Sequence, residues 1–149
     1  MAGVRFKGAT GEIATGTSAK TIAQIVAASN HGVLIDTIEV GFKGVSNTAS
    51  PILVRLVRQT TAGTMSSLTL VKDPDDADET LQTTAQHTAT AEPTSGDVIW
   101  SGLVHPQLGW QWPYAGRGRE IKIGGGDRLG VVVTAAADVN CTVSFAGEE

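Results

Sequence analysis

Residues 139–145 read VNCTVSF, and apolar and polar side chains alternate in this stretch without exception. Successive side chains of a strand point to opposite faces, so the pattern predicts a strand with one buried face. Cys141 then shares the inner face with Val143 and Phe145, which favours a buried structural thiol over a reactive one. The rest of the fold follows from how often this period of two returns along the chain.

The same alternation appears at residues 37–43, 68–72, 120–123 and 129–133. Residues 52–58, ILVRLVR, are apolar on both faces, as expected of a central strand. Six or more short strands joined by turns rich in Gly, Pro, Asn and Asp, with no long amphipathic helix, predict an all-β protein. We expect an antiparallel, jelly-roll-like β-sandwich.

The domain boundaries follow from the glycine spacing near the amino terminus. Glycines recur at positions 3, 8, 11 and 16 among Thr and Ala, which predicts an extended glycine-rich arm over residues 1–18. Residues 19–149 form a single β-sandwich domain in this interpretation. Residues 20–27 fit either a short helix or a strand, and their β-branched side chains favour the strand. Residues 29–32, SNHG, predict a turn.

Two stretches do not fit simple strands. Residues 80–95 are rich in Thr, Ala and Gln, and residues 102–118 are aromatic and interrupted by two prolines. Long loops in a compact domain are usually functional or ordered by a partner. We therefore expect two such loops.

The composition excludes several classes of function. The 149 residues carry a net charge of -4 and only 17% charged residues, which is the wrong sign for binding nucleic acid or an anionic membrane. Residues 1–20 contain no apolar run of signal-peptide length, and no stretch is apolar over the length needed to span a bilayer, so we expect synthesis in the cytoplasm. A surface with so few charges is typical of a protein that other proteins cover.

Candidate chemistry is sparse. Residues 124–130, GGGDRLG, lead into a strand rather than a helix, so a hairpin turn is favoured over a nucleotide loop. Acidic residues 73–79 lack the spacing of an EF-hand, which favours a solvated loop and leaves an irregular calcium site as the alternative. His31, His87 and His105 lack the spacing of paired metal ligands. We expect no enzyme activity, no cofactor and no metal.

The aromatic residues are unevenly distributed. Trp100, Trp110, Trp112 and Tyr114, which are all the tryptophans and the only tyrosine, fall within fifteen consecutive residues. Such rings dominate protein interfaces, although tryptophan also fills cores, and the sequence leaves both readings open. Arginine is the other residue type enriched at interfaces. The interface candidates are Trp110, Trp112, Tyr114, Arg117 and Arg119.

Several short motifs carry a resemblance to a known family. In order they are TTAGT at 60–64, AEPT at 91–94, VHPQ at 104–107, RE at 119–120, GGDRLG at 125–130 and EE at 148–149. Together they resemble the small jelly-roll head decoration, or capsid cement, proteins of tailed bacteriophages, over roughly residues 20–149. The resemblance implies a homotrimer on the exterior of the virion. It would bind the major capsid protein at three-fold and quasi-three-fold positions and bridge neighbouring capsomers.

Within this hypothesis the arm supplies the capsid-contact candidates Val4, Arg5, Phe6 and Lys7. Phe6 would be the apolar anchor, and the two cations would face acidic capsid groups. One alternative within phage biology is a tail, baseplate or fibre component. The alternative from another class is a carbohydrate-binding β-sandwich, in which outer loops contact glycans through exposed aromatic rings.

Overall fold

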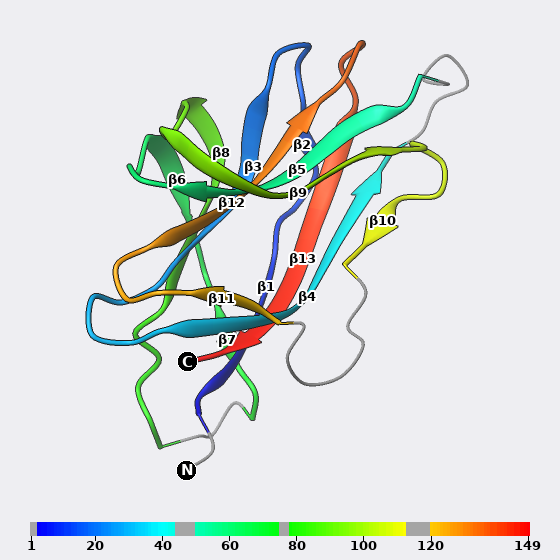
Figure 1. The fold of residues 1–149 in the computed structure, drawn as a ribbon. Coiled ribbons are helices and arrows are strands. Elements are labelled where there is room, and N and C mark those ends of the chain that lie inside the picture. Colours follow the sequence, from blue (N-terminus) through cyan, green and yellow to red (C-terminus); the bar gives the residue numbers. More distant parts are fainter. Residues whose placement is uncertain (1–2, 44–49, 75–77, 113–119) are drawn as a thin grey trace.

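The structure, a computed structural model, describes residues 3–43, 50–74, 78–112 and 120–149, which form thirteen strands and no helix. Every strand pairing is antiparallel, and the strands form two facing sheets, as Figure 1 shows. The predicted antiparallel β-sandwich is therefore confirmed. The strands are β1 (Arg5–Ala9), β2 (Ile13–Ala14), β3 (Lys20–Val26), β4 (Val33–Phe42), β5 (Ile52–Gln59), β6 (Thr64–Leu68), β7 (Val71–Lys72), β8 (Thr84–Ala91), β9 (Ser95–Val104), β10 (Trp110–Gln111), β11 (Ile121–Ile123), β12 (Arg128–Thr134) and β13 (Asn140–Glu148).

The chain passes repeatedly from one sheet to the other. Sheet A has the order β10-β4-β13-β1-β7, with β11 also pairing with β4 and β2 with β13. Sheet B has the order β6-β8-β3-β12-β5-β9. The strands β3, β4 and β5, for example, lie in sheets B, A and B. Crossing between sheets in this way wraps the chain around one core, as in jelly rolls.

The core lies between the sheets and is built from the predicted alternation. Along β13, buried and half-buried residues alternate throughout, and Cys141, Val143 and Phe145 are buried as expected. Strand β5 is paired on both sides, by β12 and β9, which confirms the expected central strand. Residues 20–26 form β3, so the strand interpretation of that segment is confirmed.

The amino-terminal residues are extended, but they belong to sheet A instead of forming a separate arm. Strand β1 pairs with β13 on one side and with β7 on the other. Phe6 is 1% exposed, because the alternation in residues 5–9 sends it and Gly8 inward. A side chain at Gly8 would overlap the ring of Phe145. The main chains of Val4 and Glu149 exchange two hydrogen bonds, so Val4 lies beside the last residue of the chain.

The two expected loops are partly wrong. Residues 84–91 form β8, in which Ala85 and Ala89 are buried and the threonines supply β-branched side chains. Residues 95–104 form β9, so only residues 105–109 of the second stretch are a loop before β10 begins. Neither strand is obvious in the sequence, because the buried positions of β8 carry only alanine and β9 has a single buried residue, Val104.

The glycine-rich residues 124–127 form a tight turn, as expected, but not a hairpin. The main-chain amide of Asp127 donates to the carbonyl of Gly124 at 3.0 Å, and Gly126 has a φ of 81°. This positive φ at the third residue is typical of a type II turn. The turn joins β11 of sheet A to β12 of sheet B, so it crosses between the sheets.

A chain of buried amides lies on the side of sheet B away from the core. Gln24 Nε2 donates to Gln59 Oε1 at 2.7 Å, and Gln59 Nε2 donates to Thr21 Oγ1 at 2.9 Å. The chain ends at Glu92, whose carboxylate accepts from the Thr21 hydroxyl at 2.6 Å and from its main-chain amide. Gln24 and Gln59 are nearly inaccessible because the connections at 60–63 and 92–94 are hydrogen-bonded to each other above them.

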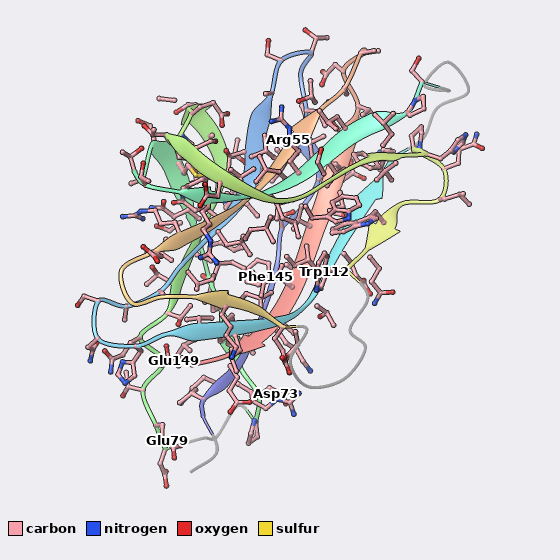
Figure 2. All side chains as sticks on the ribbon, in the orientation of Figure 1. Arg55, Asp73, Glu79, Trp112, Phe145 and Glu149 are labelled. Carbon is pink, nitrogen blue, oxygen red and sulfur yellow. The ribbon has the colours of Figure 1, made fainter. Side chains whose placement is uncertain are left out.

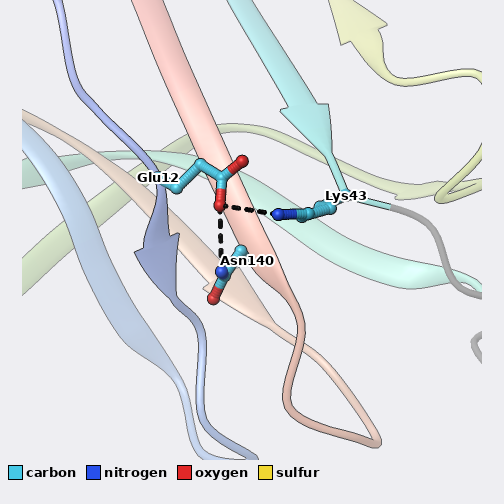
Figure 3. Close-up of polar contacts among 3 residues, drawn as sticks. All are labelled: Glu12, Lys43 and Asn140. Carbon is cyan, nitrogen blue, oxygen red and sulfur yellow. Dashed lines mark hydrogen bonds and ion pairs between the residues drawn. The ribbon is translucent and has the colours of Figure 1, made fainter.

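Two carboxylates, those of Glu149 and Glu12, form hydrogen bonds near the ends of sheet A. The Glu149 carboxylate accepts hydrogen bonds from the main-chain amides of Gln82 and Thr83, each at 2.7 Å, and from the Thr83 hydroxyl at 2.6 Å. Glu12 Oε2 contacts Lys43 Nζ at 3.3 Å and Asn140 Nδ2 at 3.1 Å (Figure 3). The Glu12 group is exposed, so it contributes little stability.

Candidate interaction site

The three tryptophans gather where the edge strands of the two sheets approach each other. Trp100 lies on β9 and Trp110 on β10, and their rings stack with centroids 4.3 Å apart and planes inclined by 22°. Trp112 follows at 6.3 Å from Trp110, with its plane tilted by 59°. Its main-chain amide donates to the carbonyl of Ile38 at 2.7 Å. The stack therefore closes one side of the sandwich between β9 and β10.

The indoles are half-buried, so they share features of both interpretations that the sequence left open, an interface and a core filling. All three pack against the core. Trp100 lies flat over Gly102, where a side chain would overlap the ring. Stacking covers one face of Trp100 and one of Trp110, and those faces are lost to any ligand. This geometry gives the stack a structural role and leaves less ring face for a sugar to stack on.

Three of the five exposed large apolar side chains among the described residues lie on one segment, before Trp100 or between Trp100 and Trp110 in the sequence. Val98 and Leu103 on β9 are 48% and 72% exposed, and Leu108, in the connection to β10, is 85% exposed. Large aliphatic side chains concentrated on one segment are typical of a surface that meets another protein. The sequence does not single them out, because the conspicuous residues of this segment are aromatic and Leu103 lies on a strand.

The four capsid-contact candidates are divided between the surface and the interior. Arg5 and Lys7 point outward from β1, while Phe6 points into the core and Val4 is half-buried. Phe6 is therefore not accessible to a partner in this fold. Lys7 borders an open hollow of about 470 Å³ on the outer face of sheet A, together with Thr37, Glu39 and Val71.

The interface candidates are only partly described. Trp110 and Trp112 belong to the stack, whereas Tyr114, Arg117 and Arg119 lie outside the described residues. Part of the acidic segment 73–79 also falls outside them. Asp73 is described: its carboxylate lies 2.8 Å from Lys7 Nζ, and that hydrogen bond and charge hold its pKa below the usual range.

The pKa values of two other carboxyl groups, Glu12 and Asp36, are shifted in opposite directions. The hydrogen bond from Asn140, together with Lys43, lowers the pKa of Glu12. Partial burial raises the pKa of Asp36 on β4, and Glu120 and Glu148 add to the rise while Arg5 opposes it. In the part of the chain that the structure describes, no group of His, Cys, Asp and Glu side chains is arranged to hold a metal.

Cys141 is predicted to be unreactive in the folded protein. Burial raises the pKa of its thiol to about 12, with Lys20 opposing the rise weakly. A thiol reagent at pH 8 should therefore label native protein far more slowly than protein unfolded in concentrated guanidinium chloride. Because the unfolded chain ionises first, the thiol's contribution to stability is complete at neutral pH and falls as the pH rises from about 9 toward 12. Rapid, complete labelling of native protein would contradict this placement.

Comparisons with protein families, curated proteins and solved structures identify no relative: none of the three finds a match. The described residues also contain no helix that could cross a membrane.

Proposed function

We propose that this protein is a structural component of a tailed-phage virion, namely a head decoration protein. In this proposal it binds the outside of the capsid as a homotrimer at three-fold and quasi-three-fold positions and bridges neighbouring capsomers. The proposal draws on the short motifs quoted above and on a surface suited to association.

One observation carries the proposal: exposed apolar side chains are concentrated on residues 98–108 of a rigidly held edge. The Trp100–Trp110 stack fixes this edge against the other sheet. The exposed Leu103 and Leu108 therefore lose little conformational entropy when a partner binds them. A trimer can bind several capsid subunits at once. After the first contact forms, the effective concentration of the others is high, so contacts that are weak singly give tight binding together.

The fold also bears on how such a protein can be tested. Deleting residues 1–18 would remove β1 and β2 from sheet A, so a loss of capsid binding would not identify a contact. Replacing Trp110 and Trp112 by Ala would likewise disturb core packing. Leu108 is the better probe, because its side chain is almost fully exposed.

The direct test is a cryo-electron microscopy reconstruction of purified particles with and without the protein. We expect density at three-fold positions on the outside of the head that disappears when the gene is deleted and returns when purified protein is added. Leu108→Asp should weaken this re-addition, whereas Val71→Asp, on β7, should not. Density confined to the tail or baseplate would favour the alternative virion role, and binding to a glycan array without particle binding would favour the carbohydrate-binding alternative.

A further inference from the structure

Strand β9 presents the longest free edge in the described part of the chain. It is the last strand of sheet B, has ten residues and pairs only with β5. The other edge strands are shorter: β6 has five residues, and β7 and β10 have two each. Alternate residues of an edge strand direct their main-chain N–H and C=O groups away from the sheet.

Residues 100–104 of this edge lack the features that usually protect an edge strand from pairing. Residues 95–104 contain no Pro and no Lys, and Asp97 is their only charged residue. The register against β5 is regular from Trp100 to Val104, where Trp100 faces Leu56 and Val104 faces Ile52. The irregular pairing is confined to the other end of the strand. A straight template for another strand therefore runs along residues 100–104.

The side chains beside this template combine an exposed leucine with an arginine. Leu103 and Ser101 alternate with the inward residues of β9 and therefore point away from the core. Ser101 lies opposite Arg55 in the register. Arg55 is half-buried on β5, and Figure 2 shows it on the side of sheet B away from Phe145.

Arg55 makes no hydrogen bond or ion pair with any other described residue. A guanidinium is a rigid, permanently charged fork that matches a carboxylate. A half-buried guanidinium next to an apolar edge therefore attracts a partner that brings a carboxylate. The positive charge of Arg55 favours an acidic partner. The unpaired main-chain N–H and C=O groups of β9 favour an extended one, so the partner is an extended, acidic polypeptide segment.

We propose that the free edge of β9 is the site at which an extended acidic segment of the shell protein adds as a further strand of sheet B. Main-chain hydrogen bonds along residues 100–104 supply the affinity, and an apolar side chain of the segment packs on Leu103. A carboxylate on the residue opposite Ser101 reaches Arg55 across about 10 Å, which is two strand spacings. This assignment rests on the proposed function, because it names the capsid as the source of the segment.

The test measures binding of the full-length protein to purified shells that lack it. Leu103→Asp removes the apolar contact, Arg55→Glu reverses the charge, and Arg55→Gln keeps the stem without the charge. We expect Leu103→Asp and Arg55→Glu to weaken binding roughly tenfold or more and Arg55→Gln to lie between them and the wild type. The matched controls are Val71→Asp and Lys122→Glu, both exposed on sheet A, which should bind as the wild type does. Near-ultraviolet circular dichroism confirms that each variant is folded.

Hydrogen exchange supplies a readout that does not depend on mutation. Alternate amides of residues 100–104 should exchange rapidly in the free protein and become protected on the shell. Wild-type binding with unprotected β9 amides and unaffected variants would overturn the assignment while leaving the proposed function standing. Protection that appears in the free protein as its concentration rises would show that a second copy occupies the edge and would also overturn it. Failure of the wild type to bind shells would reject the proposed function and this assignment together.

Discussion

Replacing Phe6 by alanine is expected to lower the free energy of unfolding by about 3–5 kcal/mol, the usual cost of deleting a buried phenylalanine ring. Phe6 is 1% exposed and lies in the core that β1 shares with β13. Its removal leaves a cavity near Gly147, whose position already lies close to the ring. Urea denaturation followed by tryptophan fluorescence measures the change, because the stack of three indoles reports on the packed state.

The matched control is Lys7→Ala, the next residue on the same strand. Lys7 pairs with Asp73, but both side chains are substantially exposed, at 63% and 41%. We expect a change of about 1 kcal/mol or less, as for other exposed ion pairs. If Phe6→Ala cost no more than Lys7→Ala, the amino-terminal segment would be a detachable arm and its placement in sheet A would be wrong.

The fold class could be predicted because the decisive strands carry large apolar side chains at the positions that face the core. In residues 139–145 these alternate with polar side chains, and residues 52–58 are apolar on both faces, so both read as strands in the sequence. Residues 84–91 do not, because their buried positions are occupied by Ala85 and Ala89. A strand whose core contribution is two alanines has too little apolar contrast to be recognised.

The amino-terminal segment was misjudged for a related reason. Its glycines suggested freedom, but Gly8 is needed because the ring of Phe145 occupies the space that a side chain would fill. Whether a glycine makes the chain flexible or makes space for a neighbouring side chain depends on the strand that pairs with it. That partner, β13, lies more than a hundred residues away in the sequence.

The candidate site was harder to predict than the fold. The clustered tryptophans are half-buried, and the exposed apolar residues of that segment are Val98, Leu103 and Leu108. Whether β9 is an edge strand depends on sheet order, and no local pattern encodes that order. Arg55 illustrates the same point, because its significance is that it forms no ion pair with a described carboxylate.

Gly130→Ala is expected to lower the free energy of unfolding by about 2–4 kcal/mol, even though alanine is a small residue and the position needs no positive φ. A methyl group at Gly130 would overlap the side-chain amide of Gln59. That amide is held by Gln24 and Thr21, at 2.7 and 2.9 Å, and is almost fully buried. Moving it breaks both hydrogen bonds in a site that water does not reach.

The double variant makes this explanation testable, because it predicts a change of sign. Gln59→Ala alone should cost about 1–3 kcal/mol, since it leaves Gln24 without its amide partner. In that background the side-chain amide that the methyl group of Gly130→Ala would overlap is gone. The loss of glycine's freedom in the unfolded chain should then stabilise the protein by roughly 0.4–1 kcal/mol. The coupling between the two sites, measured by urea denaturation of all four proteins, is then about 2 kcal/mol or more. Gly11→Ala, where nothing lies within 4 Å, is the control and should change stability by about 0.5 kcal/mol at most. Additive effects of the two substitutions would show that Gln59 does not occupy the space above Gly130.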